Sequence, residues 1–435
     1  MTGLTASLGQ FLVNIKYEQV PAGALPLIRN AFTDTVAVIM VGITEPIVDI
    51  VRRTMVVAGS RRDARACLSS IYCAAPEAAL LAGTAAHTLD YDDQSLSGHP
   101  SAVLVPAIMA EGELLGSSGR DLVTAYLAGY EVWAELVRRD SNYHRKGWHP
   151  TSIFGVIGAA ASVAVLHHLP AERASAALAI AASHAGGLAA NFGTMTKPYH
   201  AGMAARDGLV STRLAAAGMT AGRDALERPQ GFLDAMSPDG KPDRDSPARV
   251  GKEWYLMRHS LLIKRYPACY FLHRSFEATV KMLAGRRLGP DDIAEIEVTM
   301  GRGQTTVLVN ERPQTGLEAK FSEQFSMAAA VILDDLKGDC CDLLEAFAEL
   351  VNKPGTAGHR IPQQSVHFFP VNMPNDQDLQ VFHMHVKYTG SSEAKRLQYA
   401  VRRLLIRARR ERQRVRNYVG VEAYRHNLPA ATLFV

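Results

Sequence analysis

Apolar residues recur at helical spacing through most of the first half of the chain. Three or four apolar positions in every two turns are typical of a helix with one buried face. This spacing predicts helices over residues 24–57, 76–90, 101–116, 119–138, 151–168, 170–190 and 201–218. Strand-like alternation is nearly absent from this part of the sequence. We therefore expect a large helical domain.

The pattern changes after a loop-like stretch, residues 219–258, which is rich in Pro, Gly and Asp. Beyond it, residues 271–285 and 318–333 again have helical spacing. Residues 291–300 and 382–390 alternate between apolar and polar positions, as strands do. The second part of the chain is therefore expected to mix helices with a small sheet.

These patterns predict a mainly α protein with three parts. The expected parts are an all-helical domain over 1–260, an α+β lid domain over 261–400 that becomes atypical after about residue 334, and a basic segment over 401–435. A chain of 435 residues is long enough for two or three domains.

Charge changes this picture only at one place. Residues 402–416 hold eight Arg and one Glu, or +7, so the rest of the chain carries about −3 of the net +4. Leu404, Leu405 and Ile406 would give a helix there one apolar face. A non-catalytic protein that binds through this segment is therefore one hypothesis. A solvated helix face is the commoner use of a charge run, so we expect no nucleic-acid partner.

Cysteine usage and apolar runs indicate a cytoplasmic protein. The five cysteines are odd in number, and no CxxC pair occurs, so neither a disulfide framework nor a zinc site is expected. The first residues lack a basic segment leading into an apolar run. The longest apolar run, residues 153–166, is too short to span a bilayer.

Four basic residues precede a proline at an expected helix start. Proline is favoured at the first helical position, and a helix N-terminus attracts anions. If the four starts converge, they form a pocket for a ligand with several carboxylates or phosphates. Each is also explained by the ordinary preference of helices for such a start. The four are His99-Pro100, His149-Pro150, Lys197-Pro198 and Lys264 before Pro267.

The stretch HTLDYDDQSLSGHPSA, residues 87–102, concentrates acids and histidines between two predicted helices. Its aspartates could bind a divalent cation, alone or with His87 and His99. Alternatively, Asp90 orients a neighbour while His99 moves protons. A capping loop that only contacts solvent is the third possibility. The residues by themselves leave these three uses open.

Three other residues are candidates, each with a plain structural alternative. Tyr143 shares a loop with His149, and such loops are often only surface. Lys197 lies between apolar turns, where it is either a functional buried lysine or a salt-bridged one. Cys269 follows Pro267, so it is either a stabilised thiolate or a packed small side chain. GxSxG, HExxH and GxGxxG are missing, so nothing supports covalent serine, zincin or dinucleotide chemistry.

Several motifs in order resemble the MmgE/PrpD family from about residue 5 to residue 333. They are HTLDYDDQSLSGHPSA, GYEVWAEL, KGWHPTSIFGVIGAAA, ALAIAASHAGGL, GTMTKPYHAGMAA and KRYPACYFLH. The resemblance implies a helical domain with an α+β lid, a homodimer, an active site between the domains and no organic cofactor. It also implies a small di- or tricarboxylate as the substrate.

The resemblance assigns roles by position and favours acid/base and substrate-binding use of the stretch over a metal site. The residues expected to act in catalysis are His99, His149, Tyr143 and Asp90. Those expected to bind substrate are Lys197, Lys264, His200 and Cys269. Tyr143 matches a tyrosine proposed as a proton donor in the epimerase branch.

The resemblance implies an activity like that of 2-methylcitrate dehydratase, a hydro-lyase. The alternatives within the family are an iminodisuccinate epimerase-like isomerase and a cis-aconitate decarboxylase-like enzyme. The decarboxylase branch has a Thr at Gln94, a His at Cys269 and a Tyr at Phe325, and this loop is one residue shorter before His99. These departures place decarboxylation after dehydration. The resemblance fades after residue 333, so the lid is expected to depart from the family pattern beyond that point.

Overall fold

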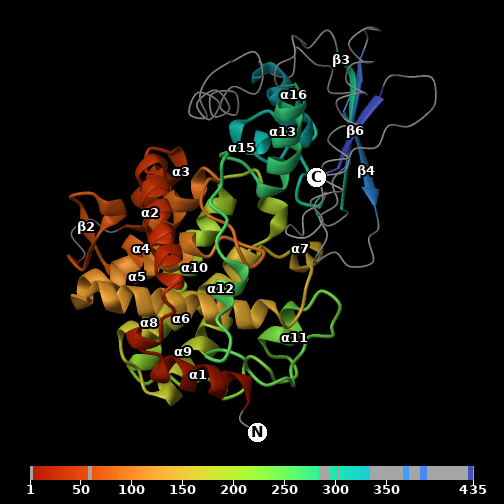
Figure 1. The fold of residues 1–435 in the computed structure, drawn as a ribbon. Helices are drawn as coiled ribbons and strands as arrows, with labels where there is room; N and C mark the ends of the chain where they lie inside the picture. The colour runs from red at the N-terminus through yellow and green to blue at the C-terminus, as the bar shows by residue number, and fades with distance from the viewer. Residues whose placement is uncertain are drawn as a thin grey trace. The chain divides into compact units, whose positions relative to one another are not determined.

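The computed structural model describes residues 3–56, 61–283, 293–301, 304, 306–333, 366–371, 383–388 and 430–434. The chain divides into two compact units. The first comprises Met1–Asn191 with Met195–Lys264, and the second Phe192–Thr194 with Arg265–Val435. Helices dominate, so the predicted mainly α class is confirmed (Figure 1).

The first unit is a helical assembly with one two-stranded hairpin, β1 (Ala64–Arg65) and β2 (Tyr72–Cys73). Three short 3₁₀ helices cover Tyr17–Gln19, Ala66–Leu68 and Ala189–Asn191. The α-helices are α1 (Leu4–Asn14), α2 (Ala24–Gly42), α3 (Pro46–Met55), α4 (Ala75–Thr88), α5 (Ser101–Leu115), α6 (Gly119–Val137), α7 (Tyr143–Lys146), α8 (Pro150–Leu166), α9 (Ala171–Ala182), α10 (Thr196–Ala216), α11 (Phe232–Met236) and α12 (Tyr255–His259).

Helix α8 is the centre of this unit. Every one of its 17 residues is buried, as expected of a helix that is apolar on all sides. It packs against α6 and α10, and α10 also packs along α4. Helix α1 lies beside α9, at the base of the view in Figure 1. The helices that carry the candidate site therefore belong to the core.

The crossing of α4 and α10 is unusually close. A side chain begun at Gly202 would lie 2.3 Å from the carbonyl oxygen of Leu80, and one at Gly83 would lie 2.9 Å from the Cα atom of Gly202. Only glycine lets the two backbones approach so closely. Because His87 and Lys197 lie little more than one turn from this crossing, the two glycines set how near these side chains come.

The helix boundaries depart from prediction where proline or capping intervenes. The single helix predicted over 24–57 is wrong, because α2 ends at Gly42 and α3 begins at Pro46, whose nitrogen cannot extend a helix. Helix α9 ends at Ala182, well before residue 190. Helix α10 begins at Thr196, so Lys197 lies inside its first turn and not before it. Short helices also interrupt the predicted loop 219–258.

The second unit contains α13 (Tyr270–Leu283), α15 (Gly316–Ala319), α16 (Glu323–Leu333) and a mixed sheet. Its strands are β3 (Ile293–Gly301), β4 (Val366–Val371), β5 (His383–Tyr388) and β6 (Ala430–Phe434), in the order β4-β3-β5-β6. Strand β3 runs parallel to β4 and antiparallel to β5. The two predicted strands are confirmed. The predicted Arg-rich run lies outside the described residues, as do Cys340 and Cys341.

Among the described residues, α2 alone is long and apolar enough to cross a membrane. Its apolar stretch is 33% buried, and it lies near the N-terminus. Core helices of soluble proteins and signal sequences have the same length and apolar composition, so this helix is weak support for a membrane span.

Candidate functional site

Asp90 lies at the centre of a buried group of charged and imidazole side chains in the first unit. We call this group the central cluster, and its members are His87, Asp90, Asp92, His99, His149, Lys197, His200 and Lys264. Lys197 Nζ donates to Asp90 Oδ1 at 2.8 Å, and Lys264 Nζ donates to the same oxygen at 3.0 Å. Asp90 is only 3% exposed, so both ion pairs are shielded from water.

The backbone at Asp90 turns sharply just after α4 ends. Its φ angle is 51°, in the left-handed region, which Asp adopts more readily than most residues. The N–H group of Asp90 donates to the carbonyl oxygen of His87 at 3.3 Å, and Lys264 Nζ donates to the carbonyl oxygen of Asp90 at 2.7 Å. Lys264 thus stabilises both the turn and the carboxylate.

Asp92 contacts two imidazoles at once. His87 Nδ1 lies 2.9 and 3.0 Å from the two carboxylate oxygens of Asp92. His99 Nδ1 lies 3.1 Å from Asp92 Oδ2, and His99 Nε2 lies 3.7 Å from Asp90 Oδ1. Sequence reasoning placed His87 and Asp92 in the right stretch but did not select them. The only available signal was their spacing around the turn at Asp90.

His149 and His200 extend the cluster on its other side. His149 precedes Pro150 as the capping residue of α8, and its N–H group donates to the carbonyl oxygen of Gly187 at 3.0 Å. The rings of His87 and His149 are stacked at 5.6 Å. His149 Nδ1 lies 3.2 Å from His200 Nδ1, so one nitrogen donates and the other accepts.

Burial and neighbouring charges decide which of these groups are ionised. Burial opposes ionisation of Asp90, but Lys197 and Lys264 outweigh it and hold the pKa of Asp90 well below its usual range. Burial lowers the pKa of His87 to about 3, although Asp92 acts in the opposite direction. Burial and Lys197 also lower the pKa of His149 well below its usual range. The cluster therefore combines an ionised Asp90 with neutral imidazoles at His87 and His149.

Another buried acid, Asp93, lies next to the cluster. Asp93 accepts a hydrogen bond from the Ser101 hydroxyl group, and the N–H group of Asp93 donates to Asp34 Oδ2 at 3.0 Å. Burial, together with Asp34 and Asp92, raises the pKa of Asp93 to about 8, against the effect of Ser101. At neutral pH, Asp93 is therefore protonated while Asp92 is ionised.

The structure brings together six of the eight predicted site residues, all in the first unit: Asp90, His99, His149, Lys197, His200 and Lys264. The basic groups converge as predicted. However, the two lysines are held together by ion pairs with the carboxylate of Asp90 and not by a set of helix N-termini. Of the four predicted helix starts, Pro150 occupies the first position of its helix, whereas Pro100 is the capping residue before α5. Pro198 lies within α10, and Pro267 precedes α13 by three residues.

Tyr143 and Cys269 are not members of the central cluster. Tyr143 is buried against Phe154, at 4.7 Å between ring centroids, and its hydroxyl group has no hydrogen-bond partner among the described residues. Cys269 belongs to the second unit, where it is 8% exposed and its N–H group donates to the carbonyl oxygen of Lys320. Their assigned roles stay predictions.

Four members of the cluster have the donor types of a transition-metal site. One ligand atom from each of His87, Asp90, Asp92 and His99 lies within 4.8 Å of the others. However, Asp90 already carries two ammonium groups, and Asp92 already accepts from both imidazoles. A cation bound here would lie beside two lysines and would compete with these contacts, so the residues fit a metal poorly.

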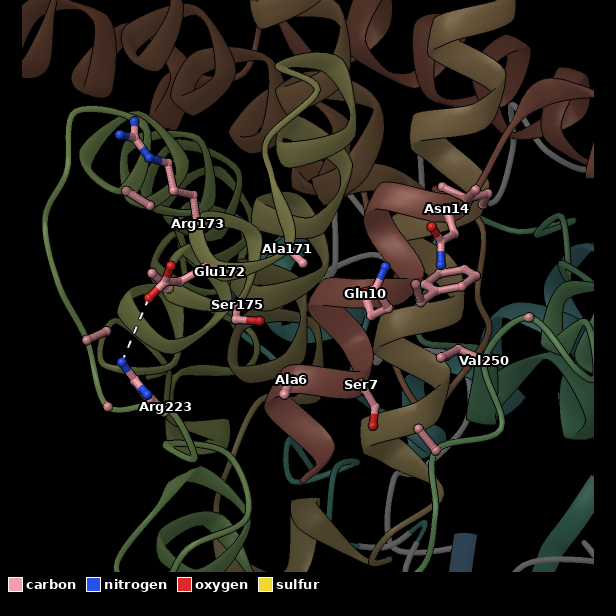
Figure 2. Close-up of a pocket in the computed structure, with 18 of the residues that line it drawn as sticks. Ala6, Ser7, Gln10, Asn14, Ala171, Glu172, Arg173, Ser175, Arg223 and Val250 are labelled. Atoms are coloured by element: carbon pink, nitrogen blue, oxygen red, sulfur yellow. Dashed lines mark ion pairs between the residues drawn. The ribbon is translucent and has the colours of Figure 1, made fainter. Parts of the chain in front are cut away.

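A groove of about 1020 Å³ lies apart from the cluster, and none of the cluster residues lines it. Ser7 and Gln10 of α1 and Ser175 of α9 line it, as Figure 2 shows. Its ion pair joins Glu172 and Arg223 at 4.0 Å, and both side chains are largely exposed. Exposed pairs contribute little, and the groove lacks the buried ionised groups of the cluster.

Two domains of one protein family match this chain, in order along the sequence. The MmgE/PrpD N-terminal domain matches residues 6–245, and the MmgE/PrpD C-terminal domain matches residues 266–339. Cis-aconitate decarboxylase of Homo sapiens is 33% identical over 269 residues, which cover 59% of this chain and 55% of that protein. Cis-aconitate decarboxylase of Aspergillus terreus is 26% identical over 361 residues, which cover 76% of this chain and 72% of that protein.

The chain thus spans about half the length of the human relative it matches, and 54% of the length of the Mus musculus cis-aconitate decarboxylase. The C-terminal match ends near the point where the motifs fade. Because the N-terminal match alone covers more than half of the sequence, the chain belongs to the MmgE/PrpD family.

Proposed function

We propose that this protein is a cofactor-independent lyase that acts on a small di- or tricarboxylate, and that its first reaction is loss of water, as in 2-methylcitrate dehydratase. One observation carries the proposal. Two buried ammonium groups share the carboxylate of Asp90, with the imidazole Nε2 atom of His99 at 3.7 Å from the same oxygen. Such a site binds a carboxylate and removes a proton beside it.

The proposed reaction begins when His99 takes a proton from a carbon next to a substrate carboxylate. The electron pair left on that carbon delocalises onto the carboxylate, where Lys197 and Lys264 stabilise the added charge. A carbon–carbon double bond then forms as the carbon–oxygen bond of the hydroxyl group breaks, and a proton from an acid completes the water that leaves. Asp90 balances the two lysines while the site is free.

Imidazoles that are neutral in the free protein suit this sequence of events. Burial and Lys197 keep the pKa of His149 low, so the His149 ring is neutral. A neutral ring does not attract the anionic substrate away from the lysines. A bound polycarboxylate adds negative charge beside the imidazoles, which raises their affinity for a proton. His149, paired with His200 at 3.2 Å, is therefore suited to take up a proton from solvent and to give it to the leaving hydroxyl group, while His99 keeps the proton removed from carbon.

Decarboxylation is the second candidate, because the similar proteins from Homo sapiens and Aspergillus terreus are cis-aconitate decarboxylases. In that reaction the bond to a carboxylate breaks, carbon dioxide leaves, and the same acid protonates the carbon. The departures at Gln94, Cys269 and Phe325 place this candidate second. Epimerisation of iminodisuccinate would use only the proton transfers.

We also propose that the protein acts as a homodimer in the cytoplasm. Met40 and Val41, at the end of α2, are 64% and 60% exposed. Large apolar side chains grouped on a surface are typical of protein interfaces. Light scattering of the purified protein at several concentrations tests this proposal, since a constant monomer mass contradicts it.

The activity is tested by proton NMR of the metal-free protein in D₂O with 2-methylcitrate, citrate, cis-aconitate and iminodisuccinate, each alone. Loss of water supports the first candidate and loss of carbon dioxide the second, whereas deuterium entry without net change supports epimerisation. Lys197→Ala serves as the inactive comparison and Lys252→Ala, at an exposed lysine of the same unit, as its control. A folded protein that changes none of the four contradicts the proposal.

A further inference from the structure

We propose that Asp92 is a positioning residue that fixes His87 and His99 as the same tautomer, with the proton on Nδ1. Each ring then presents the lone pair of its Nε2 atom. For the reaction, this inference rests on the proposed function, because it explains why His99 can act as a base. The tautomers themselves do not depend on any substrate.

The surroundings of His99 Nδ1 allow only a donor. It lies 3.0 Å from the main-chain carbonyl oxygen of Asp93 and 3.1 Å from Asp92 Oδ2. A carbonyl oxygen has no proton to give, so the hydrogen bond requires N–H at Nδ1. In the neutral ring, Nε2 then carries the lone pair that removes a proton from a substrate carbon.

The Nδ1 atom of His87 is also restricted to donating, here by the two carboxylate oxygens of Asp92. It lies 2.9 and 3.0 Å from the two oxygens of Asp92, and both side chains are fully buried. The imidazoles outweigh the effect of burial and keep Asp92 ionised, so it can only accept. The rings of His87 and His99 lie 4.5 Å apart, so one carboxylate orients both.

The arrangement at His87 also limits what it can bind. Its Nε2 atom has no hydrogen-bond partner among the described residues, and the side chain is 1% exposed. A neutral ring with its proton on Nδ1 offers Nε2 only as an acceptor. A ligand group that contacts it must therefore be a donor, such as the hydroxyl group of a hydroxy acid. This favours a hydroxylated polycarboxylate as the substrate class.

The test is nitrogen NMR of the full-length protein labelled with ¹⁵N-histidine, without ligand. Protonated and bare ring nitrogens differ widely in chemical shift, so each tautomer is read directly. His87→Gln and His99→Gln assign the two signals. Asp92→Asn is then compared with Asp93→Asn, because the neighbouring Asp93 already carries a proton and asparagine resembles its protonated form.

In the unaltered protein we expect both rings to be protonated at Nδ1 and bare at Nε2. An asparagine amide can accept from one ring but cannot accept from two with the same strength, so Asp92→Asn should move at least one ring toward the Nε2–H tautomer. Asp93→Asn should leave both rings unchanged. Asp92→Glu, which restores an acceptor carboxylate, should return them at least in part toward Nδ1–H. Circular dichroism confirms that each variant is folded.

A proton on Nε2 of either ring in the unaltered protein overturns the inference, whatever the variants do. Where activity is found, Asp92→Asn should lower kcat by about 10²-fold or more, as for a base held in the wrong tautomer. If Asp92→Asn leaves both rings protonated at Nδ1, the positioning role of Asp92 is overturned as well. If the four polycarboxylates are all inert but both rings are protonated at Nδ1 and Asp92→Asn shifts at least one of them, the proposed function fails and the positioning role of Asp92 stands.

Discussion

Lys264 binds Asp90 at two points. Its Nζ atom lies 2.7 Å from the main-chain oxygen and 3.0 Å from Oδ1 of Asp90. The same aspartate has a left-handed backbone, with φ at 51°. One ammonium group therefore balances the buried carboxylate and also stabilises an unfavourable turn. Lys197, by contrast, contacts the carboxylate alone at 2.8 Å.

Lys264→Met should lower the free energy of unfolding by about 3 kcal/mol, because removal of one partner from a buried ion pair leaves its charge poorly compensated. Urea denaturation monitored by circular dichroism measures this. Lys252→Met, at an exposed position, should change stability by less than about 0.5 kcal/mol. Equal effects at the two lysines would show that the contacts with Asp90 add nothing to stability.

Lys197→Ala should reduce kcat/KM on the identified substrate by about 10²-fold or more, since it removes a cation that stabilises charge formed during the reaction. Steady-state kinetics measures this, and Lys197→Arg should recover part of the loss by keeping the charge. Unchanged kcat/KM in the folded Ala variant would remove Lys197 from the site.

Asp93→Asn should change how stability depends on pH. The pKa of Asp93 is raised to about 8, chiefly by burial, whereas an unfolded aspartate titrates near pH 4. Between these values, the folded protein holds a proton that the unfolded chain has released. The stability gained from that proton is complete below about pH 4 and is lost as pH rises through about 8.

The variant lacks this loss, so its stability relative to the unaltered protein should increase by up to about 1.4 kcal/mol per pH unit between pH 5.5 and 7.5. Urea denaturation at three pH values measures the trend. Parallel curves for the two proteins would mean that Asp93 is ionised in the folded state.

His149→Gln should lower kcat by about 10²-fold or more, whereas His200→Gln should have a smaller effect. The side chain of His149 is 1% exposed and its ring stacks on that of His87, while His200 is half-buried and contacts the cluster through His149. Single-turnover kinetics compares the two. A larger loss at His200 would reverse the assignment of the proton-transfer group.

Gly202→Ala should destabilise the protein by about 1–3 kcal/mol, although alanine is the better helix former. The added carbon would lie 2.3 Å from the carbonyl oxygen of Leu80, so α10 would have to move away from α4. Gly119→Ala, where nothing lies within 4 Å, is the matched control and should be close to neutral. Calorimetry of both variants measures the difference.

Much of the fold could be predicted because its signals are local. The apolar spacing of α8 and the alternation in β3 involve neighbouring residues only, and both elements form where they were predicted. The break before Pro46 was missed because apolar spacing continues on both sides of it. The periodic pattern shows which face is buried, but it does not show where the helix stops.

The sequence indicates which residues form the site better than it indicates how they pair. The motifs selected Asp90 and Lys264, yet 174 residues separate them, and no local pattern shows that they pair. Asp92 was not selected, because the role proposed for it depends on which nitrogen of each ring it contacts. Tyr143 was selected by the resemblance as well as by its place in a loop, and its ring packs in the core against Phe154.

The distance in sequence between Asp90 and Lys264 has a consequence for biosynthesis. Asp90 leaves the ribosome 174 residues before the lysine that holds its backbone and carboxylate. Until then, the helices already made can pack, but they must bury an aspartate in a left-handed turn with part of its counter-charge missing. The last segment of the first unit therefore completes the electrostatic balance of its centre, and nascent chains that stop short of residue 264 should be the ones that chaperones retain.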